Sequence, residues 1–462
     1  YLNEYSRVFT PTFFMSNSDA VFNVNDQNDL SEVRGETLLT VWEPTVSYNT
    51  DIGERSSFNA VVGYTEQKID FRNLGLYTQG LPSNNIRVSG AAAPANVQNI
   101  AGVNNISGLR SLFGRINYNH QDKYLIQFTM RRDATSKFSP DFRVGYFPSV
   151  SAGWKIHNEP FFSQSGIMNR FKLRAGYGTL GSQNIPDYSY QSVFGLTSNT
   201  SFGSALQTGY AQTAFALEDL QWEEATTFNI GADLGFFNDR FLLSLEYYNK
   251  DVSDELVGVN LPSTAGTSLP VIRNAGSINN SGFEIEAKYR SLNVGDFRYE
   301  IGFNLGPFDS EITELPNPII GPSTSEDLTR VNRFIEGEAP GVYWGFIIDG
   351  VYADQAAIES DPNIANDPVR QSLVQPGDFI RRDINGDGVI NADDQTVLGA
   401  PTPDFIYGIT FSGTYKQFDF SLFFYGVQGN EIYNLNKCFN IFWADENKLS
   451  DVLNAWTPDN RN

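Results

Sequence analysis

The chain has 462 residues, of which 40% are apolar and 19% charged, and this balance excludes an intrinsically disordered protein. Its 54 acidic and 32 basic residues give a net charge of −22, which excludes a basic surface of the kind that tracks nucleic acid. No apolar run reaches the roughly 18 residues of a transmembrane helix, whereas 36 Phe, 22 Tyr and 40 Gly favour strands and turns.

Segments that alternate apolar and polar residues recur along the chain and predict β-strands. In chain order they are 58–64, 112–119, 124–132, 149–156, 170–179, 226–237, 241–250, 282–290, 297–305, 405–415 and 418–424. Most are about nine residues or longer, enough to cross a bilayer when tilted.

The links between these strands alternate in length. Residues 120–123, 238–240, 291–296 and 416–417 form short links, and residues 133–148, 180–225, 251–281 and 306–403 form long ones, the last being the longest. This parity places the short links at one end of the strands and the long links at the other, as in outer-membrane barrels. The predicted fold class is therefore all-β: a large antiparallel transmembrane β-barrel with short periplasmic turns and long extracellular loops.

The two faces of each predicted strand differ in polarity. In the strand 282–290, for example, Phe283 and Ile285 share an apolar face, and Glu284 and Glu286 share a charged one. Apolar faces without charge suit lipid, and charged faces suit a wet lumen. A soluble β-sandwich also alternates in this way, but the link parity and the strand lengths favour the barrel.

The sequence gives little support to enzymatic chemistry. Cys438 is the single cysteine, so no internal disulfide and no cysteine-based zinc site can form. The two histidines, His120 and His157, lie in predicted short links without a visible nucleophile beside them. Catalytic residues and bound organic cofactors are therefore not expected, and the protein is predicted not to be an enzyme.

Several blocks resemble one family, the SusC/RagA-type TonB-dependent transporters. They include GRINYNHQDKYLIQFTMRRD (Gly114–Asp133), GYFPSVSAGWKIHNEPFF (Gly145–Phe162), LQWEEATTFNIGADLGFFNDRF (Leu220–Phe241), GAPTPDFIYGITFSGTYKQFDFSLFFYGVQG (Gly399–Gly429) and LNAWTPDN (Leu453–Asn460), in the order that the family has them. The resemblance covers residues 109–462, and residues 1–108 look like more variable barrel strands and loops.

The resemblance implies a location, a function and partners. Members of this family import bulky nutrients, oligosaccharides or peptides, through a plugged barrel in the outer membrane of Gram-negative bacteria. A SusD-like surface lipoprotein helps to capture the substrate, and the TonB complex acts through the plug. The N-terminal plug and the final strands are not visible in this sequence, nor is a signal peptide, so the chain is expected to be part of a longer protein.

One loop has the residue spacing of a calcium-binding EF-hand loop. Its predicted ligands are Asp383, Asn385, Asp387, the carbonyl of Val389, Asn391 and Asp394. Asp394 stands where Glu is usual, and the flanking segments 377–382 and 395–399 are expected to be loops rather than helices. The alternative is an acidic turn held by its own hydrogen bonds without a metal.

The sequence leaves two further questions open, namely which residues contact the substrate and whether the protein transports at all. Tyr343, Trp344 and Phe346 could contact substrate from the longest link, although a loop packing on its own apolar residues explains them as well. The competing function is a calcium-stabilised cell-surface β-protein that binds or adheres without transport. The sequence does not identify the substrate.

Overall fold

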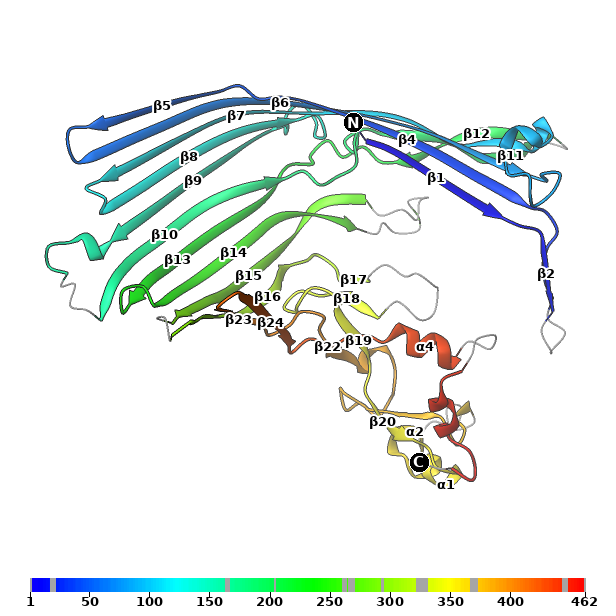
Figure 1. The fold of residues 1–462 in the computed structure, drawn as a ribbon. Coiled ribbons are helices and arrows are strands. Elements are labelled where there is room, and N and C mark those ends of the chain that lie inside the picture. The colour runs from blue at the N-terminus through cyan, green and yellow to red at the C-terminus, as the bar shows by residue number, and fades with distance from the viewer. Residues whose placement is uncertain are drawn as a thin grey trace.

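The computed structural model describes residues 2–16, 22–162, 167–202, 205–259, 264, 271–291, 295–320, 331–365, 373–442 and 448–460, and all elements named here lie within them. The largest part of the fold is a single antiparallel sheet of 14 strands, curved into an open arc (Figure 1). No helix among the described residues is long and apolar enough to cross a membrane.

The strands of this sheet follow one another in chain order, with each hairpin beside the next. They are β1 (Leu2–Thr10), β4 (Asp29–Trp42), β5 (Thr45–Ile52), β6 (Ser56–Gln79), β7 (Val97–His120), β8 (Tyr124–Thr135), β9 (Val144–Lys155), β10 (Met168–Ser182), β13 (Glu223–Phe236), β14 (Phe241–Val259), β15 (Val271–Arg290), β16 (Phe297–Glu314), β23 (Phe405–Tyr415) and β24 (Phe418–Gln428). This arrangement confirms the predicted antiparallel barrel architecture.

The predicted link parity is confirmed. The short turns, such as those at 121–123, 237–240 and 416–417, lie at one end of the arc, on the left in Figure 1. The long links lie at the other end. Residues 292–294 of one predicted short link fall outside the described residues.

The sheet has more and longer strands than the sequence predicts. The prediction omitted β1, β4 and β5, and it gave only 112–119 for β7, which spans Val97–His120. At about 3.3 Å per residue, a strand of 24 residues is roughly 80 Å long, far more than a bilayer needs. The extra length lies toward the long links, where both faces of a strand can be wet. The division of the chain at residue 108 falls inside β7 and stays a prediction.

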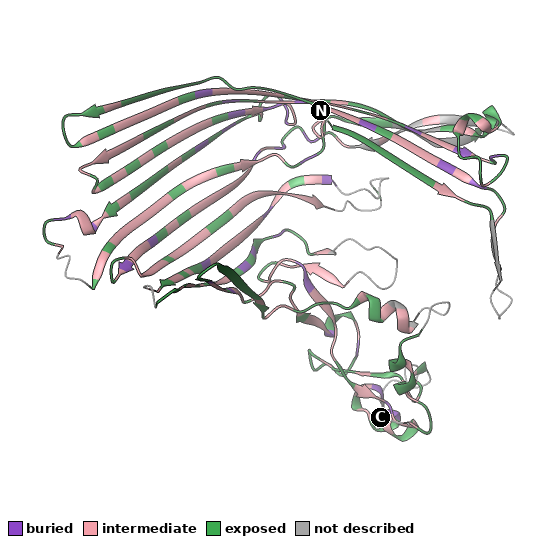
Figure 2. Ribbon diagram, in the orientation of Figure 1, coloured by how far each residue is buried: buried purple, intermediate pink, exposed green. Residues whose placement is uncertain are grey.

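The predicted apolar faces form a continuous outward belt. Ile116 lies opposite Phe128, Phe128 opposite Val150, and Val150 opposite Tyr177. The same outward face carries Phe228, Ile230, Phe283, Phe303, Ile409 and Phe424 on the following strands, and all of these side chains are exposed. Figure 2 shows exposed and half-buried residues alternating along the strands, with few buried ones. Among the described residues no second sheet covers the belt, so the β-sandwich alternative is wrong.

The long links carry smaller elements. They include the strand pairs β2 (Phe13–Ser16) with β3 (Phe22–Asn25) and β11 (Val193–Phe202) with β12 (Ala205–Ala214), and the strands β17 (Ile319–Ile320), β18 (Asn332–Phe334), β19 (Val342–Phe346), β20 (Ile348–Val351), β21 (Phe379–Arg381) and β22 (Gln395–Gly399). Helices α1 (Gln355–Ser360), α2 (Pro362–Ala365) and α4 (Leu435–Phe442) lie in this region too. The expectation that 377–382 and 395–399 are loops is wrong, because β21 and β22 occupy them and pair with β20 and β19.

Two small cores hold these links together. In the first, the rings of Phe138 and Phe147 contact the indole of Trp222, with centroids 5.5 and 5.4 Å away. The Trp222 indole also donates a hydrogen bond of 3.1 Å to the Arg143 carbonyl. In the second core, Tyr352 packs with Ile358 from the link between β16 and β23. The long links are therefore ordered by their own buried residues.

Candidate functional site

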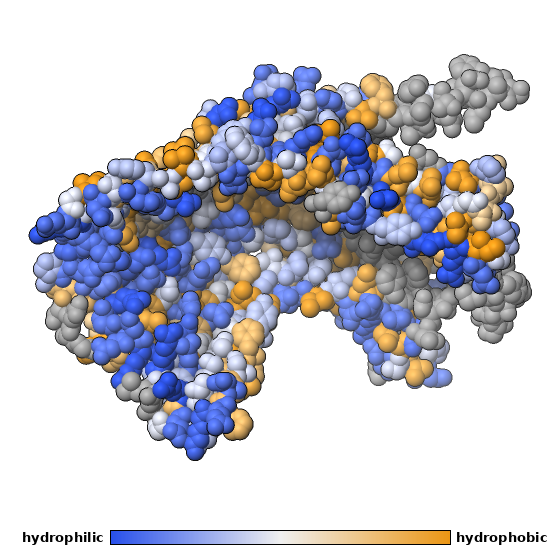
Figure 3. All heavy atoms as spheres, turned by 45° about the horizontal axis from the view of Figure 1, so that its top comes forward, coloured by the Kyte–Doolittle hydropathy of each residue, from blue (hydrophilic) through white to orange (hydrophobic). Residues whose placement is uncertain are grey.

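The inner face of the arc carries the charged and amide side chains that the sequence places opposite the apolar faces. Hollows of about 530, 590 and 300 Å³ open on it along the strands β5 to β16. Hydrophilic residues spread over the left part of the space-filling view, where the short-turn ends of the strands lie (Figure 3). The inner face is therefore the part of the molecule that a polar cargo could contact.

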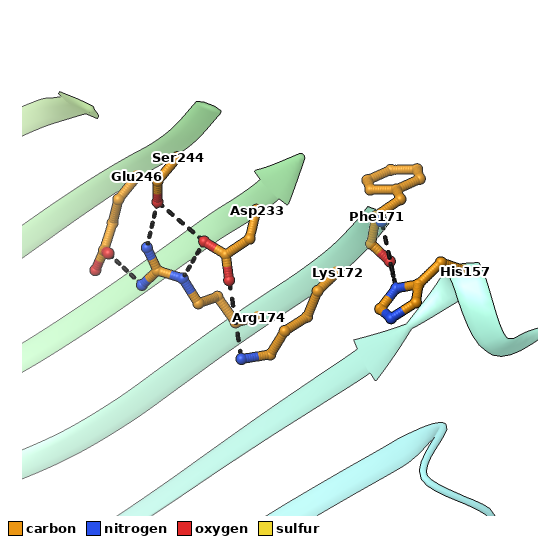
Figure 4. A network of polar contacts seen from close by, with 7 residues as sticks. All are labelled: His157, Phe171, Lys172, Arg174, Asp233, Ser244 and Glu246. Carbon is orange, nitrogen blue, oxygen red and sulfur yellow. Dashed lines mark hydrogen bonds and ion pairs between the residues drawn. The ribbon is translucent and has the colours of Figure 1, made fainter. Parts of the chain in front are cut away.

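A network centred on Arg174 joins three neighbouring strands of this face (Figure 4). The guanidinium of Arg174, on β10, lies 3.4 Å from the Asp233 carboxylate on β13 and bonds the Glu246 carboxylate on β14. It also donates to the Ser244 hydroxyl at 3.3 Å, and Lys172 lies 3.8 Å from Asp233. One cation thus balances carboxylates from two different strands.

The position of Arg174 depends on a glycine beneath it. Gly231 faces inward between Arg174 and Glu246, and a Cβ atom placed on it would lie 2.9 Å from the Arg174 Cζ. Any larger side chain would push the guanidinium away from Glu246. The glycine therefore makes room for the arginine to reach across a whole strand.

The two lumen carboxylates noted in the sequence have different surroundings. Glu286 lies 3.9 Å from Lys288, whereas no ion pair within the described residues joins Glu284 to a cation. Glu284 lies directly opposite Glu246 on β14. Both carboxylates are exposed to the lumen, as expected for residues on the charged face of a strand that lines a wet interior.

In the part of the chain that the structure describes, neither histidine lies between a nucleophile and an acid. His157 lies in the 3₁₀ turn η3 (Ile156–Asn158), with its Nδ1 2.9 Å from the Phe171 carbonyl oxygen. His120 ends β7, and its Nδ1 lies 2.8 Å from the hydroxyl of Ser56, the first residue of β6. Both bonds fix strand ends.

A buried carboxylate, Glu159, ties together the short-turn ends of β8 and β9. It accepts hydrogen bonds from the Tyr124 hydroxyl at 2.6 Å and the Trp154 indole at 3.1 Å, and its other oxygen lies 3.0 Å from the Lys123 ammonium. These three donors hold the pKa of Glu159 down, to about 2, because each favours the charged form. This contact could not be predicted from the sequence, because it depends on how the link after β9 folds back against the start of β8.

We expect Glu159 to stabilise the barrel in a pH-dependent way. Its pKa is about 2 in the folded protein against 4.5 ordinarily, so its stabilisation is complete above about pH 4.5 and disappears as the pH falls toward 2. Glu159→Gln should therefore lower the unfolding temperature of the full-length protein at pH 7 and lose its effect near pH 2. Thermal unfolding in detergent across that range measures the difference.

The matched control is Glu54→Gln, which removes an exposed carboxylate from the turn between β5 and β6. This variant should unfold like the parent at every pH. A Glu159→Gln effect that stayed constant down to pH 2 would assign the stabilisation to packing rather than to the carboxylate.

The acidic loop 383–394 folds as a series of turns that close on their own side chains. The Asp383 carboxylate accepts from the Gly386 and Gly388 amides at 2.7 and 2.9 Å, and Asp387 accepts from the Val389 amide at 2.7 Å. Asp394 is fully buried and accepts from the Ile384 and Asn391 amides at 2.9 and 2.7 Å. Within the described residues, no three His, Cys, Asp or Glu side chains converge closely enough to hold a metal.

The aromatic candidates lie together on β19 but face different partners. The Trp344 indole donates to the Gln395 side chain at 3.0 Å, and the Tyr343 ring lies 6.3 Å from that of Tyr433. The guanidinium of Arg381 lies 4.9 Å above the Phe346 ring. All three are half-buried, so their role as substrate contacts stays a prediction.

A family model described as "TonB dependent receptor-like, beta-barrel" matches residues 2–449. The chain is 31% identical to a TonB-dependent receptor of Formosa agariphila over 427 residues, which is 90% of this chain and 42% of that protein. It is 30% identical over 329 residues to the TonB-dependent receptor SusC of Bacteroides thetaiotaomicron, covering 70% of this chain and 32% of SusC.

Among solved structures, the fold matches the RagAB peptide transporter with a TM-score of 0.81 at 21% identity. The match covers 99% of this chain and 48% of that one. The chain thus spans less than half the length of each of these three relatives.

Proposed function

The chain belongs to the β-barrel family of TonB-dependent receptors, non-enzymatic proteins of the Gram-negative outer membrane, and we propose that the full-length protein imports bulky nutrients in the manner of SusC and RagA. The cargo would be oligosaccharides or peptides, and energy would come from the TonB complex through a plug in the lumen.

The observation that carries this proposal is the opposite polarity of the two faces of one sheet. The outer face carries a belt of exposed apolar side chains, and the inner face carries the Arg174 network and the amide groups around it. A cell-surface adhesion module without transport would need no polar inner wall of this kind, and the family match also argues against it.

Transport is tested in the parent cell. Deleting the gene should abolish growth on a limiting oligosaccharide or peptide mixture, and deleting TonB should do the same. Uptake that persists without the gene, or that does not require TonB, would contradict the proposal.

We propose a SusD-like lipoprotein as the partner at the long-link end. Apolar side chains are exposed there, among them Ile348, Phe379 and Leu398, and exposed apolar patches mark interaction surfaces. Co-purification of a single lipoprotein with the full-length receptor would support this partner. Its loss in a Phe379→Asp variant, with retention in the parent, would localise the contact.

We also propose that the acidic loop binds calcium. Asp383, Asp387 and Asp394 keep lone pairs beyond those used by the backbone amides, and Asn385 and Asn391 lie between them. The carboxylates do not converge in the present geometry, so binding would draw Asp387 toward Asp383 and Asp394. The gain would be rigidity of the segment that leads into β22 and β23.

Calcium binding should be visible by isothermal titration of the full-length receptor. Asp383→Asn with Asp387→Asn should weaken binding by at least about tenfold, because each ligand charge lost lowers calcium affinity. The control is Asp393→Asn, an exposed acid in the same loop that is not a predicted ligand. Equal heats in the double variant and the control, or none in the parent, would favour the metal-free acidic turn.

A further inference from the structure

The outward face of the sheet carries cations directly beyond the apolar belt, on the side of the long links. On β8 the outward residue that follows Met130 is Arg132, and on β7 Arg110 follows Leu112. On β6, Lys68 lies one outward position further along. All three cationic side chains are exposed. We call Lys68, Arg110 and Arg132 the cation group.

Aromatic rings place this level at the edge of the bilayer. Arg132 lies opposite Tyr146 on β9, and Tyr64 lies two strands away on the same level. The centroid of the Tyr64 ring is 5.7 Å from that of Trp42, which is also exposed. Tyr and Trp gather where the hydrocarbon of a membrane meets the headgroups. The cation group therefore begins where the apolar belt ends.

The length of β8 gives the same position. Arg132 is eight residues from Tyr124, at the short-turn end of the strand, which is about 26 Å of strand. The tilt of barrel strands reduces this to about 20 Å along the membrane normal, close to an apolar band of roughly 25 Å. Because the short turns are periplasmic, the cation group lies at the headgroups of the outer leaflet.

A hollow of about 370 Å³ opens beside Lys68 and Arg110. Two small residues line it, Gly108 opposite Lys68 and Ala134 opposite Arg110, and they leave room between the long side chains. The other face of the sheet is closed at this point, because Leu109 packs on the first small core. The hollow therefore opens outward, toward the lipid headgroups.

Cations outnumber carboxylates around the hollow. Arg110 pairs with Glu66 at 3.0 Å, and Asp70, beside Lys68, is held by another arginine at 3.0 Å. In the part of the chain that the structure describes, no ion pair joins Lys68 or Arg132 to a carboxylate. A charge at the edge of the hydrocarbon is costly without a counter-charge. An anion at this level would supply the missing charge.

We propose that the cation group binds the phosphate of a phosphorylated glycolipid of the outer leaflet, with the acyl chains of the lipid lying along the apolar belt. Lys68 and Arg110 would flank the phosphate in the hollow, and Arg132 would reach it from the edge of the belt. Ammonium and guanidinium groups give phosphate oxygens charge-assisted hydrogen bonds, and Leu112 would contact the acyl chains. The site would anchor the receptor in the outer leaflet, a role separate from import.

Two other partners fit less well. The lipoprotein proposed above would cover the ends of the long links, whereas the cation group lies on the side wall at the level of the belt edge. A second copy of the receptor, in a two-fold contact centred here, would bring the same cations face to face. Like charges in such a contact would repel each other.

The test is native mass spectrometry of the full-length receptor in detergent. The probes are lipid A, the same lipid enzymatically dephosphorylated, and inorganic phosphate. Lys68→Gln with Arg132→Gln should weaken lipid A binding by about tenfold or more, because each cation near an anionic headgroup contributes to affinity. The dephosphorylated lipid should bind the parent and this variant equally weakly, and inorganic phosphate should not displace lipid A.

A second variant tests the hollow without changing any charge. Gly108→Val should also weaken lipid A binding, because its side chain would occupy the space between Lys68 and Arg110. A Cβ atom on Gly108 meets only the Gln67 carbonyl oxygen, at 3.6 Å, so the strand should keep its structure.

The control is Arg290→Gln with Lys416→Gln, which removes the same two charges near the short turns. This control should bind lipid A like the parent. Equal lipid A affinity in the two double variants would overturn the inference, as would equal binding of the two lipids to the parent. Displacement of lipid A by inorganic phosphate would assign the site to a free anion and overturn it too. Nutrient uptake should persist in Lys68→Gln with Arg132→Gln, so failure of this site leaves the import function standing.

Discussion

Replacing Ile409 by arginine should prevent most of the receptor from assembling in the outer membrane. Ile409 lies at the middle of β23, facing outward between Phe303 on β16 and Phe424 on β24. An arginine facing lipid at this depth costs about 2–4 kcal/mol, and the lost apolar contact adds to that cost. The amount of folded, heat-modifiable receptor in outer-membrane fractions measures the effect.

The adjacent residue provides the control. Thr410 faces the lumen, on the same level as Gly302 and Lys288 on the neighbouring strands. Thr410→Arg adds the same charge one residue away, where water can solvate it, so assembly should remain near the parent level. If both variants assembled equally well, the outward belt would not contact lipid, and the barrel interpretation of this sheet would fail.

The opposite environments of Ile409 and Thr410 show why the membrane-spanning part of the fold could be predicted from the sequence. Within the bilayer every second residue must be apolar, so β8, β10, β13 and β23 alternate clearly. Where a strand extends beyond the bilayer, its outward-facing residues no longer need to be apolar. The stretch 97–111 of β7 carries no such pattern, although it pairs with β6 throughout. Its strand structure comes from its partner rather than from its own residues.

Near the N-terminus, a two-residue interruption between β4 and β5 breaks the alternation of apolar and polar residues. β4 and β5 pair with successive parts of β6, and residues 43–44 interrupt them. Pro44 has no N–H to give to the ladder, but its carbonyl still accepts from the Tyr64 amide at 3.1 Å. The two strands therefore act as one, which a residue-by-residue pattern does not reveal.

Some contacts on the inner wall could be predicted from the sequence, and others could not. The tight turn at 237–240 fixes the register of β13 and β14, so the placement of Asp233 opposite Ser244 follows from the turn alone. The position of Arg174 between Asp233 and Glu246 cannot be predicted in this way, because the 40-residue link 183–222 separates β10 from β13 and leaves their register open. Long links hide register. Whether the acidic loop holds calcium stays a prediction.

The second large effect is expected from removing Arg174. Its side chain is 29% exposed, and it balances Glu246, which is 16% exposed, and Asp233. Arg174→Leu would leave two partly buried carboxylates without this cation, and a charged hydrogen bond lost at such a site costs about 1.5–3 kcal/mol. We expect the unfolding free energy of the full-length receptor in urea to fall by about 2–3 kcal/mol.

The cause of that loss can be separated from packing by neutralising a partner as well. In Arg174→Leu with Glu246→Gln no unbalanced charge remains at Glu246, so part of the lost stability should return, because the two residues interact directly. Lys172→Gln is the control: its ammonium lies 3.8 Å from Asp233 and is 32% exposed, so its loss should cost less than about 1 kcal/mol. If the double variant were as unstable as the sum of the two single ones, Arg174 would act through its aliphatic stem, and charge balance across β10, β13 and β14 would not hold this wall together.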